Sequence, residues 1–241
     1  MKSNHIEYDF EKSRKRIDEI LNTSDTAYEE LDNIPSRDKL TFTNGFYVYC
    51  SALFVDIRKS SELPEIYKRP TLARIYRCYI SEVVAIMNRD SDCSEINIDG
   101  DCIWGIFNTK YKQYFDYLFE TSAMISSIID ILNCRLKVKG IEPISVGIGL
   151  DYGRALMIKA GYEGSGINEV VWMGEVVNSA SELSSYGNKT YLDNETMISD
   201  VFYSNLKEDY KKLSEWNETR KCWHGNIIDI GMNEWYKENC K

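Results

Sequence analysis

The chain has 241 residues and a mass of 28.0 kDa, which suits one large domain or a domain with an appendage. Its net charge of -9 and pI near 4.9 exclude a non-specific nucleic-acid binder, because the phosphate backbone requires a basic face. No stretch has the apolar length of a signal peptide or a membrane span, so we expect a cytoplasmic protein without stable membrane association. The seven cysteines include no CxxC pair, which predicts reduced thiols rather than disulfides or a zinc site.

The N-terminal 35 residues differ in pattern from the rest of the chain. Apolar residues recur at helical spacing through 7–34 and Pro35 ends the pattern, so we predict an N-terminal helical extension at 1–35. A main domain at 36–241 follows, in which strands and helices alternate with two direct hairpins. This order predicts an α+β fold, a sheet covered by helices. The expected elements are a strand at 46–57, a helix at 70–89, a hairpin at 95–107, a helix at 111–138, strands at 143–150 and 169–173, a helix at 174–186, and a last mixed portion ending near 232.

Acidic side chains occur where two of the predicted strands end. Asp56 follows the apolar run at 52–55, and Asp99 and Asp101 flank Gly100 in the hairpin turn. Magnesium and manganese prefer hard oxygen ligands, usually one or two carboxylates together with the substrate's phosphates. An Asp-Gly pair in a hairpin is most often only a turn, so these acids alone leave both interpretations open.

Four segments, in order along the chain, resemble the motifs of class III nucleotidyl cyclases. FVDIRKSS resembles the first metal motif, which places Asp56 and the carbonyl group of Ile57 at the metal. DGDCIWGIF resembles the second metal motif, with Asp101 as its aspartate, and VGIGLDYGRALMIKAG is similar to the glycine-rich motif that follows. VVWMGEVVNSASEL resembles the motif whose amide, here Asn178, contacts the substrate ribose. The resemblance extends from about residue 46 to residue 232.

This resemblance implies a fold, a reaction and a partner. The fold is a ferredoxin-like class III cyclase domain in a head-to-tail homodimer, with the aspartates of one protomer facing the asparagine helix of the other. The ribose 3′ oxygen of a nucleoside triphosphate attacks the α-phosphorus, and pyrophosphate leaves. Two Mn²⁺ or Mg²⁺ ions per site would be held by Asp56, Ile57 and Asp101.

Base recognition departs from the purine cyclases. Asn97 stands where adenylate cyclases have lysine and guanylate cyclases have glutamate, and Val171 stands at the second base-recognition position. A purine edge facing valine would leave hydrogen bonds unmade, at a cost of about 1 to 3 kcal/mol each. Phe54, in the first metal motif, is a further candidate for substrate contact. Tyr49 could stack on a small base together with Tyr47, although such alternating aromatics are more often packing residues.

The phosphate contacts depart from the family as well. Glu182 stands four residues after Asn178, where the family has an arginine that stabilises charge in the transition state. A late lysine that touches the triphosphate is replaced by His224, with Lys221 close by. For every basic candidate, an ordinary surface role is the more common alternative. The candidates to replace the family arginine are Arg58, Arg154, Lys159 and Lys189.

Among class III cyclases, the chain most resembles the pyrimidine-nucleotide cyclases of the bacterial Pycsar anti-phage system. The resemblance includes IPSRDKLTFTNGFYV and MIKAGYEGSGINEVVWMG. It implies synthesis of cyclic CMP or cyclic UMP, a preference for manganese, and a separate effector protein, and we favour CTP over UTP as substrate. Two alternatives remain: a purine cyclase whose base-recognition residues have moved, and a catalytically silent domain that senses nucleotide. Retention of both Asp56 and Asp101 speaks against the sensor.

Overall fold

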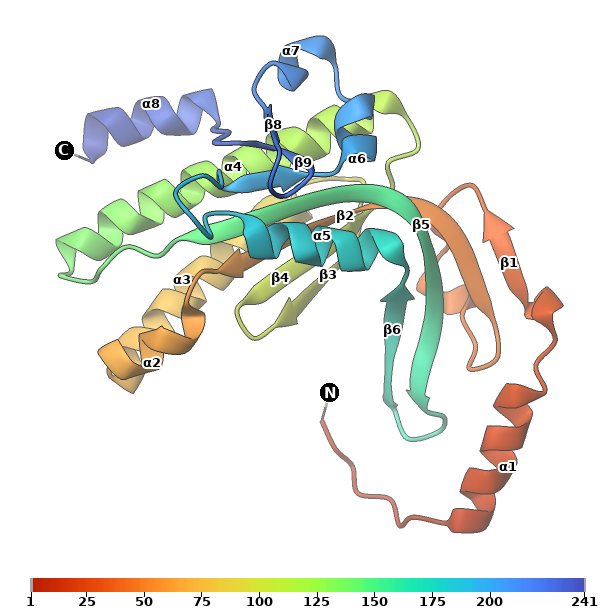
Figure 1. Ribbon diagram of the computed structural model, residues 1–241. Coiled ribbons are helices and arrows are strands. Elements are labelled where there is room, and N and C mark those ends of the chain that lie inside the picture. Colours follow the sequence, from red (N-terminus) through yellow and green to blue (C-terminus); the bar gives the residue numbers. More distant parts are fainter. Residues whose placement is uncertain (1, 241) are drawn as a thin grey trace.

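The computed structural model describes residues 2–240, in which nine strands form one sheet flanked by helices (Figure 1). The sheet order is β3-β4-β2-β5-β7-β9-β8, with β1 paired to β2 and β6 paired to β5. The strands are β1 (Tyr28–Leu31), β2 (Gly45–Ile57), β3 (Cys93–Asp99), β4 (Cys102–Phe107), β5 (Val146–Tyr162), β6 (Ile167–Met173), β7 (Thr196–Ile198), β8 (Glu215–Asn217) and β9 (Cys222–Gly225). The helices are α1 (Phe10–Leu21), α2 (Leu63–Ile66), α3 (Arg69–Asn88), α4 (Lys112–Val138), α5 (Glu175–Tyr186), α6 (Asp200–Asn205), α7 (Glu208–Lys211) and α8 (Ile230–Asn239). The predicted α+β architecture is confirmed.

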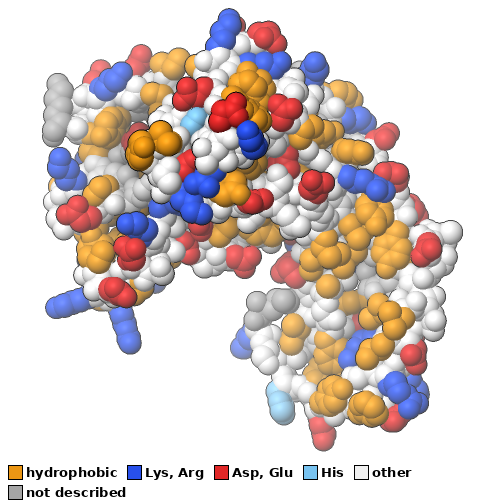
Figure 2. Space-filling view, in the orientation of Figure 1, with side chains coloured by type: hydrophobic (Ala, Val, Ile, Leu, Met, Phe, Trp, Pro, Cys, Tyr) orange, Lys and Arg blue, Asp and Glu red, His pale blue; other side chains and the backbone are white. Residues whose placement is uncertain are grey.

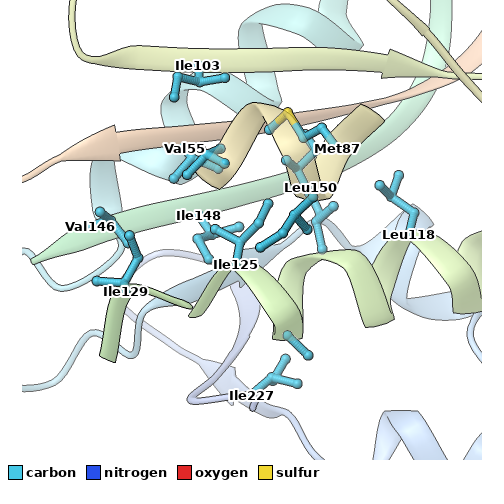
Figure 3. Close-up of a cluster of buried hydrophobic side chains, with 14 of the residues drawn as sticks. Val55, Met87, Ile103, Leu118, Ile125, Ile129, Val146, Ile148, Leu150 and Ile227 are labelled. Atoms are coloured by element: carbon cyan, nitrogen blue, oxygen red, sulfur yellow. The ribbon is translucent and has the colours of Figure 1, made fainter. Parts of the chain in front are cut away.

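One face of the sheet packs against α3 and α4 and forms the main core. Val55 of β2 and Ile148 and Leu150 of β5 point toward α4, where Ile125 and Ile129 meet them (Figure 3). Burying such a side chain stabilises the fold by roughly 1.5 to 3 kcal/mol. Because strand side chains alternate between the two faces, burying Val55 here directs its neighbours Phe54 and Asp56 to the opposite face. The core thus determines where the predicted metal ligand points.

The opposite face of β5 is covered by α5, which approaches the sheet very closely. A Cβ atom added to Gly149 would lie 2.1 Å from the carbonyl oxygen of Ala180, and one added to Gly147 would lie 2.1 Å from that of Ser184. Only glycine allows the helix backbone to rest on the strand in this way. The glycines of the third motif therefore fix the position of α5, the helix that carries Asn178.

The N-terminal segment differs from the prediction of one helix over 7–34. Helix α1 ends at Leu21, a short 3₁₀ helix at Asp25–Ala27 follows, and Tyr28–Leu31 pairs parallel with the first residues of β2. The run from Asn22 to Thr26 explains the break, because Asn, Thr, Ser and Asp compete with helical hydrogen bonds through their own side chains. The Ser24 side chain accepts a hydrogen bond from the N–H of Thr26 at this point. The apolar spacing beyond Leu21 thus belongs partly to an edge strand.

The expectation that all seven cysteines are reduced is wrong for two of them. Cys134 of α4 and Cys240, which follows α8, form a disulfide across 106 residues of sequence. A search for cysteines close together in the sequence misses this disulfide, because its two cysteines meet only when α8 packs beside α4. None of the helices within residues 2–240 combines the length and apolarity that crossing a bilayer requires.

Candidate active site

The two aspartates of the predicted metal site lie at one corner of the sheet. Asp56 is the penultimate residue of β2, and Asp101 follows Gly100 in the two-residue turn between β3 and β4. Gly100 has a φ of +65°, in the left-handed region that favours glycine. Because β4 runs antiparallel to β2, the start of β4 lies beside the end of β2. This pairing brings together two carboxyl groups that are 45 positions apart in the printed sequence.

Arg58 binds Asp56 directly. Its Nη2 atom lies 2.6 Å from Asp56 Oδ2, and its Nη1 atom donates to the carbonyl oxygen of Ser185, near the end of α5, at 2.8 Å. Burial raises the pKa of Asp56, the Arg58 guanidinium opposes that rise, and the nearby Asp101 carboxyl adds to it. Arg58 is therefore a structural partner both of Asp56, the predicted metal ligand, and of α5.

The donor set at this corner fits a magnesium or manganese ion. The carboxylates of Asp56 and Asp101 and the carbonyl of Ile57 are all hard oxygen ligands. Asp101 Oδ2 is buried and has no hydrogen-bond partner within residues 2–240, a costly arrangement that a bound cation would relieve. No cluster of three or more His, Cys, Asp and Glu side chains suited to a metal is found in the same range. Substrate phosphates and water would have to supply the remaining ligands.

The exposed side of α5 carries Asn178 and Glu182, one helical turn apart. The opposite side of the helix packs against the sheet through the buried residues Val176, Ala180 and Leu183. Glu182 accepts a hydrogen bond from the hydroxyl of Tyr186, one further turn along. Glu182, which stands where the family has an arginine, is therefore hydrogen-bonded to a neighbouring side chain of its own helix.

Aromatic side chains occupy the face of β2, β3 and β4 that carries Asp56. Phe54 stacks on Trp104 with ring centroids 5.2 Å apart and ring planes 1° apart. Asn97 lies directly across from Trp104 in the β3–β4 pairing, and its Nδ2 atom is buried without a partner among the described residues. The structure therefore brings Phe54 and Asn97 to the same face as Asp56.

A group of residues beside Asn97 was not anticipated from the sequence. Glu95, two residues earlier on the same face of β3, is buried and accepts hydrogen bonds from Trp172 Nε1 at 3.0 Å and Arg37 Nη2 at 3.2 Å. Arg37 also binds Glu169 of β6 at 2.8 Å. The run Glu95-Ile-Asn97-Ile-Asp99 shows that one face of β3 is polar, but no local signal links Arg37 to it across 58 residues. Val171 lies on β6 between Glu169 and Trp172, outside the cavity that Asn97 lines.

Several predicted substrate contacts lie away from this corner. Tyr49 lies seven residues before Asp56 on β2, roughly 23 Å away at the usual rise per residue, and packs near Tyr152. Arg154 binds Glu30 of β1 at 3.0 Å and covers the ring of Tyr47. The structure does not bring either one to Asp56 within a single chain.

The remaining basic candidates have local partners. His224 of β9 is buried, and its Nδ1 atom accepts from the N–H of Asn194 at 3.1 Å. Strands β5 and β7 separate it from β2. Lys159 lies over the ring of Phe42, Lys189 lies over the ring of Tyr186, and Lys221 pairs with Glu218.

Comparison with known proteins adds independent findings. No protein-family model matches the chain. A uridylate cyclase from Gulbenkiania mobilis is 40% identical over 99% of this chain and 100% of its own length. A uridylate cyclase from Treponema porcinum is 36% identical over 95% of this chain and 81% of its own length.

Two solved structures of similar fold are distant from this chain in sequence. The adenylyl cyclase CyaB from P. aeruginosa covers 71% of this chain and 85% of its own, at 20% identity and a TM-score of 0.61. A class III adenylyl cyclase-like ATP-binding protein from Pseudomonas aeruginosa covers 93% of this chain and 48% of its own, at 16% identity and a TM-score of 0.69. These two structures share the fold, and the two curated relatives are similar in sequence along 95% to 99% of the chain. The chain therefore belongs to the class III nucleotidyl cyclase family and is related within it to the uridylate cyclases.

Proposed function

We propose that this chain is a pyrimidine nucleotide cyclase that converts UTP into 3′,5′-cyclic UMP and pyrophosphate. Both curated relatives are named uridylate cyclase and align with nearly the whole chain. The preference for CTP expected from the sequence has no support among them, so we place UTP first and CTP second. The observation that carries the cyclase assignment is the meeting of Asp56 and Asp101 at the ends of paired strands, where the buried Asp101 Oδ2 atom has no hydrogen-bond partner among the described residues.

The chain's own residues would orient the reacting atoms. Asp56, Asp101 and the carbonyl of Ile57 would hold two Mn²⁺ or Mg²⁺ ions, and when bound these ions lower the pKa of the attacking hydroxyl and neutralise charge on the leaving pyrophosphate. Asn178, exposed on α5, would hold the ribose by its amide. The 3′ oxygen forms a bond to the α-phosphorus, the bond from that phosphorus to the β-phosphate bridging oxygen breaks, and the hydroxyl proton passes to solvent.

We propose that two chains complete each site. Asn178 and Glu182 lie on the side of α5 that faces away from the sheet of their own chain, and Asp56 lies on a face that has no helix over β3 and β4 in the described residues. A head-to-tail homodimer would place the α5 helix of one chain over the aspartates of the other and would create two equivalent sites. A single chain would then be inactive.

The wider setting is also a proposal. Residues 1–35 form an N-terminal extension and residues 36–241 the catalytic domain, working in the cytoplasm. The resemblance to Pycsar cyclases suggests a role in anti-phage defence, in which the cyclic nucleotide acts on a separate effector protein. A catalytically silent nucleotide sensor is the second candidate, because Glu182 replaces the arginine expected to stabilise the transition state.

A four-nucleotide assay tests the proposal. Purified protein with manganese is offered ATP, GTP, CTP and UTP separately, and mass spectrometry identifies each product. Cyclic UMP should be the dominant product. Dominant cyclic AMP or cyclic GMP would overturn the pyrimidine assignment, and tight nucleotide binding without any product would support the sensor.

A further inference from the structure

Strand β3, at one edge of the sheet, borders a cavity lined mainly by polar residues. The cavity has a volume of about 680 Å³ and is lined by β3 residues together with Arg37 and Glu169. Asn97, Glu95 and Arg37 are three of the hydrogen-bonding residues in this lining, and they come from two segments far apart in the chain. Figure 2 shows the molecule deeply hollowed between the body and the arm that contains α1, β6 and the end of β5 that pairs with β6.

Glu95 is an unusual group to find in such a wall. Its side chain is 6% exposed, and burying a carboxylate is costly unless charged or hydrogen-bonding partners surround it. Arg37 and Trp172 supply one hydrogen bond to each of its oxygens. A carboxylate offers about four acceptor positions, so Glu95 can still accept another hydrogen bond. As long as it is ionised, it can donate none.

Donors lie on either side of that acceptor. Arg37 has five N–H groups, and Glu95 and Glu169 accept from only one nitrogen, Nη2. On the other side, the Nδ2 atom of Asn97 is buried and unpartnered within the described chain. The cavity wall thus presents a donor, an acceptor and a donor, in the order Arg37, Glu95, Asn97.

This order distinguishes the two pyrimidines. Uracil presents an acceptor, a donor and an acceptor at O2, N3–H and O4, whereas cytosine presents a donor at N4 and acceptors at N3 and O2. We propose that Arg37, Glu95 and Asn97 together recognise the uracil edge, with Glu95 accepting from N3–H. The inference rests on the proposed cyclase function and extends it to the residues that choose the base.

Glu95 is the member of the set that discriminates. The carboxamide of Asn97 can turn by half a rotation and present its oxygen instead, so it suits either base. The carboxylate of Glu95 has no such freedom, and the N3 lone pair of cytosine would meet its negative charge. Trp172 is a positioning residue, because its bond to Glu95 joins β6 to β3 and holds the carboxylate in place.

The test compares UTP with CTP in matched variants. Glu95→Gln keeps the shape of the side chain but adds a donor, and Arg37→Gln removes one donor and the charge that stabilises Glu95. In each variant the ratio of kcat/KM for UTP to that for CTP should fall about tenfold or more, chiefly through a higher KM for UTP. Glu163→Gln, on an exposed turn of the same arm, and Lys39→Gln, two residues from Arg37, should leave the ratio unchanged.

Binding separates this inference from the cyclase assignment. Dissociation constants for UTP and CTP are measured by calorimetry with calcium in place of manganese, and thermal melting confirms that each variant is folded. The dissociation constant for CTP divided by that for UTP should fall in Glu95→Gln and Arg37→Gln, and this comparison does not require that any product forms. Absence of product would overturn only the cyclase proposal. The inference is wrong if the unaltered protein prefers CTP, or if both variants retain the original ratio.

Discussion

Arg58 Nη2 lies 2.6 Å from Asp56 Oδ2, and the same guanidinium donates to the carbonyl oxygen of Ser185 in the last turn of α5. The Arg58 side chain is only 14% exposed, so these contacts are shielded from water and salt. One side chain therefore connects the end of β2, where the proposed metal ligand Asp56 lies, with the helix that carries Asn178.

Replacing Arg58 should weaken metal-dependent activity without unfolding the protein. Arg58→Ala frees the Asp56 carboxylate to adopt other rotamers, and loss of such a supporting partner typically costs about 10- to 100-fold in metal affinity or activity. The measurement is cyclisation rate against manganese concentration, with thermal melting as a check on folding. Arg58→Lys keeps the charge but cannot contact Asp56 and Ser185 at the same time. Its activity should therefore lie between that of the unaltered protein and that of Arg58→Ala. An unchanged manganese curve in Arg58→Ala would remove Arg58 from the support of the site.

Close packing of α5 gives a second prediction. Gly149→Ala would place a methyl group 2.1 Å from the Ala180 oxygen and 2.4 Å from the Ser184 nitrogen, so the helix must move. We expect a loss of about 1 to 3 kcal/mol or more in unfolding free energy, together with a large loss of activity as Asn178 shifts. Gly153→Ala is the matched control, because its new methyl group would approach Val176 only to 3.3 Å. Equal stability of the two variants in urea would show that α5 does not depend on this contact.

The predicted metal ligands and the cavity beside β3 show which features local sequence patterns can predict and which they cannot. Asp56 and Asp101 became candidates because each lies beside a recognisable local pattern, an apolar strand end and an Asp-Gly turn, and the resemblance to the cyclase motifs then singled them out as the predicted metal ligands. Glu95 also lies in such a pattern, yet its importance comes from Arg37 and Trp172, which are distant in sequence. Contacts of this kind depend on how β6 and the segment before β2 fold back, which no local pattern specifies.

Some predicted ends of helices and strands were wrong for a related reason. The sequence predicts that the strand ends at residue 150, but β5 continues to Tyr162, because residues 151–158 pair with β2 and residues 156–162 pair with β6. The polar residues and glycines of that segment resemble a loop in isolation. In the same way, Tyr28–Leu31 joins β2 as a strand, and Cys240 meets Cys134 only once α8 has docked. In each case tertiary pairing overrode the local preference.

Asp193 gives a pH-dependent prediction for stability. Its side chain is 2% exposed and binds Arg220, Thr190 and Asn217, and these hydrogen bonds, led by that of Arg220, lower the pKa of Asp193 to about 2 from 3.8. The folded state thus releases this proton more readily than the unfolded state does. The stabilisation is therefore complete above the unfolded pKa and disappears as the pH falls through about 2.

The size of this effect can be measured with one variant. A shift of nearly two units corresponds to roughly 2 kcal/mol, at 1.36 kcal/mol per unit. The difference in unfolding free energy between the unaltered protein and Asp193→Asn should be largest above about pH 5 and should shrink by about that amount toward pH 2. Denaturant titrations across this range provide the comparison. A difference that stays constant with pH would mean that Asp193 does not titrate abnormally.

Sharing of the site between two chains is the central claim, and complementation tests it most directly. Asp56→Ala removes the proposed metal ligand and Asn178→Ala removes the proposed ribose contact, so each variant alone should form no cyclic UMP. In a heterodimer, one of the two sites contains neither substitution. An equal mixture allowed to exchange subunits has half of its dimers mixed, each with one intact site, and should recover about a quarter of the original rate. Mixed dimers that form, as shown by mass spectrometry of differently tagged chains, yet produce no cyclic UMP would contradict the shared site.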